Sequence, residues 1–487
     1  MEDIRLKRKD FVFLFSLSIG AVLLHGYHPW AEDSSLYLPG VEKLLNPKLF
    51  PFNAEFFESH AHLSIFADLI AASLRVTHLP LPYALFFWHL VSIFLLLLAC
   101  CELAGKCFNS RTSCYAGVAL VAALLTLPVA GTALYILDQY VNPRNLAAFV
   151  GPLAIAKVID RKYVMASLLL LCGVAIHPFM SSFAICLCLL LFCVENFESR
   201  QTVIASLLPF GLLDPPAAAY HQAALTHSYH YPMRWQWYEW LGVIGPIVIL
   251  WWFSRIAGAR RMRKLELISR TLVVYQTLFV AAGLAVSVPA RFESLARLQP
   301  MRSLYLTYIL LVLFSGGLLG EYVLKNRWGR WVALFLPLCA GMFYAQRVLF
   351  PASAHIEWPG SKPRNPWVQA FEWVRDNTPP DAIFALDPYY MSIEGEDENG
   401  FRDVAQRSKL ADWSTDAGAV TMFPPMAEEW LEQVQAQSGW TKFRIQDFRQ
   451  LRARYGVNWV VLQLQQPGVG DLQCPYENKA VKVCSVD

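Results

Sequence analysis

Charged residues are scarce in this chain. Asp, Glu, Lys and Arg make up 16% of its 487 residues, whereas an ordinary globular domain has about 25%. Apolar residues reach 55%, and the mean hydropathy is +0.35. This composition excludes an ordinary soluble protein, a disordered chain and a disulfide-stapled miniprotein. Because a net charge of +3 is also too small to indicate nucleic-acid binding, we predict a polytopic membrane protein.

Common nucleotide, metal and redox motifs are missing as well. No P-loop, GxGxxG, HExxH or CxxC occurs, so a cytoplasmic nucleotide-driven activity has no support. His221, His227 and His230 are spaced by six and three residues, which matches no common zinc pattern. We therefore expect no required cofactor, and we keep a divalent metal only as an alternative.

The 11 cysteines are an odd number, and nine of them lie in or beside apolar runs, where they act as small apolar residues. Only Cys474 and Cys484 lie in the C-terminal tail. On an oxidising outer face these two cysteines could pair, and two free thiols are the alternative.

Long apolar runs fill the first 350 residues. A helix needs about 20 apolar residues to cross a bilayer, and on that scale we predict about 11 spans, an all-α bundle. The expected spans are residues 11–27, 81–104, 114–135, 146–159, 163–176, 179–194, 202–213, 241–253, 271–289, 304–323 and 331–349. We thus predict a transmembrane domain over residues 1–350 and a soluble domain over residues 351–487.

Basic connections indicate the direction of the spans, because cytoplasmic loops carry an excess of Lys and Arg. The N-terminal stretch 5–9 is basic, so the N-terminus is expected in the cytoplasm and the first span is read as a retained anchor. The other basic connections fall on the same side if residues 55–76 do not cross. We therefore expect an inner (plasma) membrane protein whose C-terminal domain is extracytoplasmic.

Residues 55–76 belong to a long first outer loop, residues 28–80. On a helix, polar and apolar side chains of this segment separate to opposite sides. The polar side has His60, Ser64, Asp68 and Arg75, and the apolar side has Leu63, Phe66, Leu69, Ile70 and Leu74. Such a helix suits the membrane interface. The alternative is a true span whose polar side faces the bundle.

Residues capable of chemistry collect in the predicted outer loops. They are His28, Glu32, Asp33, Asp138, Arg144, His177, Arg234 and Arg302. Each has a structural alternative: Glu32 and Asp33 could start a helix, Asp138 and Arg144 could form an ion pair, and His177 could end a helix before Pro178. Arg302 could be an anchor at the membrane surface.

The combination of these residues suggests one task. Arginines bind phosphate oxygens through a planar fork of donors, and a carboxylate can take a proton from an attacking hydroxyl. Together these groups predict transfer of a group from a phosphate-linked lipid donor to an acceptor.

With Glu32-Asp33 in a long first outer loop, an interfacial helix after it and a soluble tail, the chain resembles the GT-C class of membrane glycosyltransferases, which use polyprenyl-phosphate sugars. It is more similar still to uncharacterised bacterial multi-span proteins of this layout. Those relatives share the segments at Asp138…Arg144, His177-Pro178 and Gln299-Pro-Met-Arg302-Ser, and the tail start Trp373-Val-Arg-Asp-Asn-Thr-Pro-Pro-Asp381.

The resemblance implies a role for each matching residue. Asp33 would be the general base, with Glu32 supporting it or exchanging roles with it. Arg144, Arg302 and Arg234 would bind the donor phosphate, and Asp138, His177 and His28 would orient substrate. The acceptor would be a glycan, a lipid or a protein, although the tail lacks the tryptophan–aspartate–glycine signature of oligosaccharyltransferases. A non-catalytic assembly protein for envelope polymers and a transporter are the alternatives; apolar span interiors argue against transport.

The tail alternates between helical and strand patterns, which predicts a small α/β domain. Helices are expected at residues 366–377, 426–437 and 445–455. Strands are expected at residues 382–386, 457–462 and 479–484. An irregular acidic loop is expected at residues 394–399.

Overall fold

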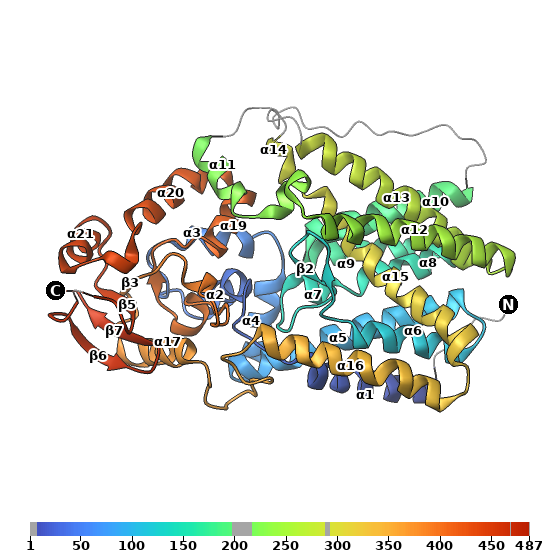
Figure 1. Cartoon of the computed structure of the whole chain (residues 1–487), viewed down its shortest axis with the longest axis horizontal. Helices are drawn as coiled ribbons and strands as arrows, with labels where there is room; N and C mark the ends of the chain where they lie inside the picture. The colour runs from blue at the N-terminus through green and yellow to red at the C-terminus, as the bar shows by residue number, and fades with distance from the viewer. Residues whose placement is uncertain (1–6, 197–216, 288–292, 468, 487) are drawn as a thin grey trace. The chain divides into compact units, whose positions relative to one another are not determined.

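The computed structural model describes residues 7–196, 217–287, 293–467 and 469–486 (Figure 1). The chain forms two compact units. The first, which we name the span unit, comprises Met1–His25, Trp88–Pro216 and Ser228–Ala345. The second, the loop–tail unit, comprises Gly26–Phe87, Ala217–His227 and Gln346–Asp487. Residues of the first outer loop therefore belong to the same compact unit as the tail.

Helices account for most of the span unit. They are α1 (Arg8–His25), α5 (Leu81–Cys107, which begins in the loop–tail unit), α6 (Arg111–Ala123), α7 (Pro143–Ala147), α8 (Val150–Ile159), α9 (Tyr163–Ile176), α10 (Pro178–Asn196), α12 (Trp237–Ala259), α13 (Arg263–Ser287), α14 (Glu293–Ala296), α15 (Leu304–Leu319) and α16 (Trp328–Leu349). Helices α6 and α15 approach closely because glycines face each other: a Cβ on Gly316 would lie 2.6 Å from the Ala116 carbonyl oxygen.

Within the described residues, six helical segments are long and apolar enough to cross a membrane. They are Leu81–Cys107, Pro178–Glu195, Trp237–Ala259, Arg263–Ser287, Pro300–Leu324 and Trp328–Leu349. These segments point to a multi-pass membrane protein, but they do not confirm the expected number of 11 spans.

The expected span at residues 114–135 is wrong. Helix α6 ends at Ala123, and the chain continues in a short antiparallel pair, β1 (Pro128–Val129) with β2 (Leu134–Tyr135). Pro128 cannot donate a helical hydrogen bond, which explains why the apolar run does not continue as helix. The expected span at residues 146–159 is divided between α7 and α8. The expected span at residues 202–213 lies outside the described residues.

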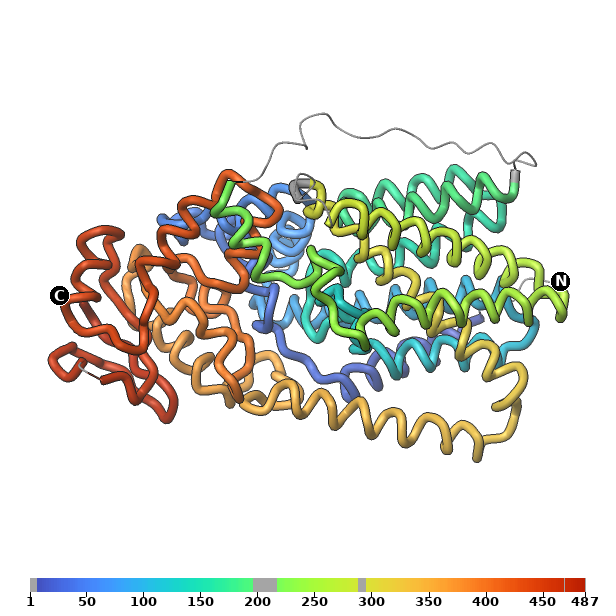
Figure 2. The backbone as a smooth tube through the Cα atoms, turned by 45° about the horizontal axis from the view of Figure 1, so that its top comes forward, coloured from blue at the N-terminus to red at the C-terminus, as the bar shows by residue number. Residues whose placement is uncertain are grey.

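The loop–tail unit combines helices with one sheet. The helices are α2 (Ser34–Leu45), α3 (Glu55–Ala61), α4 (Phe66–Thr77), α11 (Ala218–Leu225), α17 (Pro366–Asn377), α18 (Arg402–Ala405), α19 (Thr415–Met422), α20 (Ala427–Ala436) and α21 (Ile445–Tyr455). Helix α11, drawn green in Figure 2, lies beside α19 and α20, so a segment between two predicted spans also packs in this unit.

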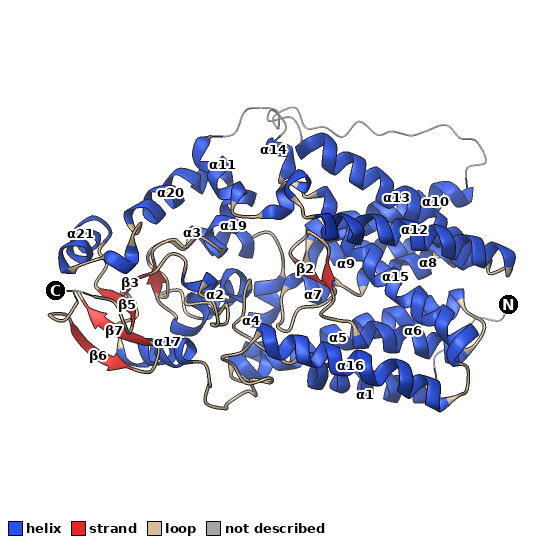
Figure 3. Ribbon diagram, viewed as in Figure 1, coloured by secondary structure: helices blue, strands red, loops and turns tan. Residues whose placement is uncertain are grey.

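Five strands form the sheet, in the order β4-β3-β5-β7-β6 (Figure 3). They are β3 (Ile383–Leu386), β4 (Ser408–Lys409), β5 (Trp459–Gln463), β6 (Gln473–Glu477) and β7 (Val481–Ser485). Strand β3 is parallel to β4 and β5, and β7 is antiparallel to β5 and β6. The small α/β domain expected for the tail is therefore present.

Side chains alternate between the two faces of this sheet. Phe384 and Val461 pack in one core with Phe371 of α17, whereas Ala385 and Val460 belong to another core, with α21. Period-two alternation with apolar residues on both sides is typical of a sheet covered on both faces. Trp30 of the first outer loop packs against the α17 core, which ties that loop to the tail.

Residues 55–76 form two helices, α3 and α4, rather than one. In α4 the one-sided pattern holds, since Phe66, Ile70 and Leu74 are buried while Asp68 and Arg75 are exposed. The chain bends between the helices, and Leu63 there is 45% exposed instead of packed. A position of α4 at the membrane interface stays a prediction.

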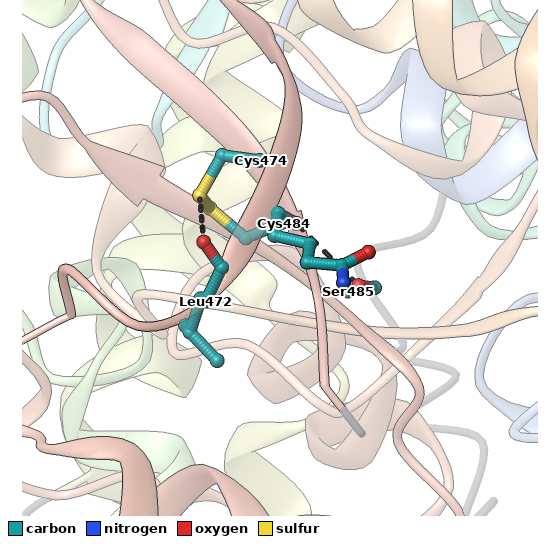
Figure 4. Close-up of a disulfide and its surroundings, with 5 residues drawn as sticks. Leu472, Cys474, Cys484 and Ser485 are labelled. Carbon is teal, nitrogen blue, oxygen red and sulfur yellow. Dashed lines mark hydrogen bonds between the residues drawn. A yellow bond between two sulfur atoms is a disulfide. The ribbon is translucent and has the colours of Figure 1, made fainter.

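Cys474 and Cys484 form a disulfide (Figure 4). They lie on the adjacent antiparallel strands β6 and β7, where directly opposed side chains come close together. The bond therefore fastens the edge strand β6 to the sheet.

Candidate functional site

The turn that carries Glu32 and Asp33 is held by the acidic loop of the tail. Glu32 has φ 51°, the left-handed region, which costs a non-glycine residue free energy. Its backbone N–H donates to the Glu398 carbonyl oxygen at 2.7 Å, and the Gly400 N–H donates to the Trp30 carbonyl oxygen at 2.8 Å. The surrounding structure thus enforces an uncommon backbone conformation at the predicted acidic pair.

Asp33 stands immediately before α2 and is partly exposed. Its side chain accepts no capping hydrogen bond from α2, so the helix-cap alternative does not account for this carboxylate. Burial, and after it the charge of Asp33, raise the pKa of Glu398. A carboxyl group whose pKa is raised and that lies beside a second carboxylate is suited to acid–base chemistry.

A second acid close to this turn, Asp403, is buried. The hydroxyl of Ser34, the first residue of α2, donates to Asp403 Oδ2 at 2.6 Å. Burial raises the pKa of Asp403 to about 7. On the same helix, Glu42 accepts a hydrogen bond of 2.9 Å from the Gln406 amide, and burial raises its pKa well above 4.5. Helix α2 is therefore fixed to the tail through acids that burial favours in the protonated form.

His28 lies in a buried cluster at the start of the first outer loop. Its ring stacks on Phe350 with centroids 3.8 Å apart, and its Nδ1 lies 4.0 Å from Glu357 Oε2. The Glu357 N–H donates to the Tyr27 carbonyl oxygen at 3.0 Å. Burial raises the pKa of Glu357 to about 8, with smaller contributions from neighbouring acids. With 1% of its side chain exposed, His28 is placed to fix the loop to the tail.

In the span unit, Asp138 and Arg144 form a buried ion pair in which Arg144 Nη2 donates to Asp138 Oδ2. The Asn142 amide donates to the same oxygen at 2.6 Å. Asn142 also caps α7, accepting a hydrogen bond from the Asn145 N–H at 2.8 Å. The side chains of Asp138 and Arg144 are 1% and 5% exposed. The structural alternative considered for this pair, an ion pair, is what the geometry shows.

Arg302 and Arg234 reach the same aromatic segment of the span unit. The Arg302 guanidinium lies 4.3 Å from the centre of the Tyr229 ring, and that of Arg234 lies 5.3 Å from the centre of the Tyr231 ring. Such cation–π contacts hold a guanidinium against an aromatic ring. Two of the three predicted phosphate-binding arginines therefore meet at residues 229–231.

His177 lies between α9 and α10. Its Nδ1 accepts a hydrogen bond of 3.2 Å from the Met180 N–H in the first turn of α10. The observed contact is thus that of a residue that caps a helix.

The structure groups the predicted site residues within each unit. Glu32 and Asp33 lie with Glu398 and Asp403 in the loop–tail unit, and His28 lies there with Glu357. The Asp138–Arg144 pair and the two tyrosine-bound arginines belong to the span unit. Among the described residues, no group of three or more His, Cys, Asp or Glu side chains could hold a metal ion.

The sequence analysis missed Glu398, Asp403, Glu357 and Asn142. The first three depend on contacts between residues more than 300 positions apart, which no local pattern reveals. Asn142 could have been found, because Asn followed by Pro143 is a typical start of a helix.

Comparison with known proteins yields no family model and no curated relative that matches the chain. The structure is similar to that of an oligosaccharyltransferase from Archaeoglobus fulgidus in its apo form, at 12% sequence identity and a TM-score of 0.45. The similarity covers 93% of this chain and 69% of that one.

Proposed function

We propose that the chain is a membrane glycosyltransferase that moves a sugar from a lipid-phosphate donor to an acceptor on the extracytoplasmic face. The observation that carries this proposal is the left-handed turn at Glu32, which the acidic loop of the tail holds and which places Asp33 directly before α2. Backbone strain at a chemically capable residue is expected where the position of that residue matters for function.

In the proposed reaction, an acceptor hydroxyl attacks the anomeric carbon of the donor sugar. Asp33 takes the hydroxyl proton as the new carbon–oxygen bond forms. The bond between the anomeric carbon and the phosphate oxygen breaks, and the lipid phosphate leaves with the bonding electrons. Glu32 supports the base. Glu398, whose pKa is raised by burial and by Asp33, can receive the proton from Asp33 at the end of a cycle.

Donor binding falls to the arginines of the span unit. Arg302 and Arg234, positioned by tyrosine rings, offer forked N–H donors for phosphate oxygens. Arg144 has a weaker claim because its guanidinium already binds Asp138. At this one residue, the ion pair favours the alternative function, a non-catalytic assembly protein.

The test is transfer of labelled sugar from polyprenyl-phosphate hexoses in membranes that contain the full chain. Asp33→Asn keeps the size of the side chain and removes the base, so activity should fall by about 100-fold or more. The matched control is Asp381→Asn at an exposed carboxylate, which should keep full activity. An Asp33→Asn variant that transfers sugar like the wild type overturns the proposed base. A wild-type chain that transfers nothing overturns the glycosyltransferase and leaves the assembly protein.

A further inference from the structure

The tail sheet presents two short segments at one of its edges. Strands β3 and β4 are parallel, so their carboxyl ends lie at the same edge, where open α/β sheets commonly bind ligands. Asp387 and Tyr389 follow β3, and Asp412 and Trp413 follow β4. The mechanism proposed above uses none of these four residues.

The two segments are tied together by a main-chain hydrogen bond. The Trp413 N–H donates to the Pro388 carbonyl oxygen at 2.9 Å. Asp387 Oδ1 accepts from the Tyr389 N–H at 2.9 Å, and Asp412 Oδ1 accepts from the Ser414 N–H at 2.9 Å. Each aspartate thus closes a tight turn, and the turns hold the aromatic residues in fixed positions.

Three aromatic rings contact one another across these segments, each pair with tilted planes. Tyr389 and Trp413 have ring centroids 5.3 Å apart, and Trp413 and Trp430 have centroids 5.5 Å apart. Trp430 is fully buried, and its Nε1 donates to the Asp412 carbonyl oxygen at 2.8 Å. At the other end Tyr389 is 45% exposed. We call Tyr389 and Trp413 the aromatic platform.

The segment that carries Trp413 is anchored by a buried network of charged side chains. Lys409 Nζ lies 2.6 Å from Asp412 Oδ2 and 3.1 Å from Asp416 Oδ2. Arg402 binds both carboxylate oxygens of Asp416, at 2.6 and 3.1 Å. These four side chains are at most 2% exposed. Burying them costs desolvation energy, but the ion pairs between them hold the turn at Asp412 and with it Trp413.

We propose that the aromatic platform, together with the adjoining Asp387 carboxylate, binds a sugar ring of an oligosaccharide, and that this glycan is the acceptor. The assignment as acceptor rests on the proposed function; the binding itself does not. A sugar ring has a face of C–H groups that packs on an aromatic ring, and its hydroxyls donate hydrogen bonds to a carboxylate. If the aromatic platform only covered the core, Tyr389 would not need to be solvent-exposed and held in a fixed position.

Binding is tested with the full chain in detergent, using maltotetraose, mannotetraose and chitotetraose as probes. Saturation-transfer NMR and intrinsic fluorescence report the dissociation constant. We expect the wild type to bind at least one probe. Tyr389→Ala should weaken that binding about tenfold, whereas Tyr389→Phe should keep it, since an aromatic ring of the same size remains. Asp387→Asn keeps the acceptor of the turn and should weaken binding through loss of the carboxylate alone.

The matched control is another aromatic pair of this unit, Trp373 with Tyr476, whose centroids are 5.2 Å apart. Tyr476→Ala should bind like the wild type. The proposal is overturned if the wild type binds none of the three probes. It is also overturned if Tyr389→Ala, with an unchanged melting temperature, binds like the wild type.

Measuring glycan binding and sugar transfer on the same variants distinguishes a wrong binding site from a wrong proposed function. Asp33→Asn should bind the probes normally and transfer sugar at least about 100-fold more slowly. A chain that binds glycan through Tyr389 but shows no transfer in any form refutes the proposed function and leaves the platform. A chain whose Tyr389→Ala variant both binds and transfers like the wild type refutes the platform alone.

Discussion

Replacing Glu357 by Gln should remove much of the pH dependence of the stability of the loop–tail unit. The Glu357 side chain is 10% exposed, and burial is the largest of the causes that raise its pKa from 4.5 to about 8. The folded state therefore holds the proton more tightly than the unfolded state. This contribution to the free energy of unfolding is complete below about pH 4.5 and is lost as the pH rises through about 8.

The magnitude follows from the change in proton affinity. A rise of about 3.5 in pKa corresponds to roughly 4–5 kcal/mol at pH 9. Because the side chain keeps 10% of its exposure, solvent lowers the cost of ionisation, and we expect on the order of 3 kcal/mol. In a unit of about 200 residues, that corresponds to a melting temperature lowered by roughly 6–12 °C.

The assay is thermal unfolding of the full chain in detergent, wild type against Glu357→Gln, between pH 5 and pH 9. The wild type should lose stability across this range, and the variant should lose clearly less, because its amide does not ionise. Glu394→Gln, at an exposed acid of the same unit, is the matched control and should follow the wild type. Identical pH profiles for wild type and Glu357→Gln would refute the assignment of the pH dependence to this carboxyl group.

Three further changes test the packing of the loop–tail unit by the same unfolding measurement. Asp416→Asn leaves Arg402 buried without its partner charge and should cost about 3–5 kcal/mol; an unchanged melting temperature would contradict this. Replacing both Cys474 and Cys484 by Ala opens a cross-link between residues 10 positions apart and should cost about 2–3 kcal/mol, an effect that reductant should reproduce on the wild type only. Gly26→Ala should destabilise the unit, because Gly26 has φ +83° and a Cβ there would lie 2.5 Å from a backbone carbonyl oxygen; a variant as stable as the wild type would show that the loop start can rearrange.

Local patterns in the tail predicted its elements well. The expected helices at 366–377 and 445–455 coincide with α17 and α21. Asn365 caps α17 by accepting hydrogen bonds from the N–H groups of the first turn, and the prolines after Thr378 end it. These signals lie within a few residues of the helix ends, which is why sequence alone could place them.

Strands that depend on their neighbours were missed. β4 has two residues, and its pairing with β3 defines it. β6 is an edge strand whose side chains alternate between exposed and half-buried, so it has no apolar stripe to reveal it. In the same way, the apolar run after Ala123 has the composition of a span, and the turn chemistry of Pro128 overrides it.

In the candidate site, too, local contacts could be predicted from the sequence and long-range contacts could not. Asp138 and Arg144 are six positions apart, and the sequence allowed for their ion pair. Neither the position of Glu398 beside Asp33 nor the hydrogen bond from Ser34 to Asp403, over 369 positions, has a local signal. From the sequence, Glu32 and Asp33 could be identified as candidate residues. The enforced turn and the neighbouring acids required the three-dimensional structure.

Because the loop–tail unit is built from separate chain segments, its parts are synthesised at different times. Ser34 leaves the ribosome 369 residues before its partner Asp403, which at about 5–20 residues per second is a delay of roughly 20–70 s. During that interval helix α2 exists without the tail that later covers it. Nascent chains that stop before Asp403 should therefore remain open to protease at the first loop, and a tail expressed alone would need residues 26–87 supplied with it.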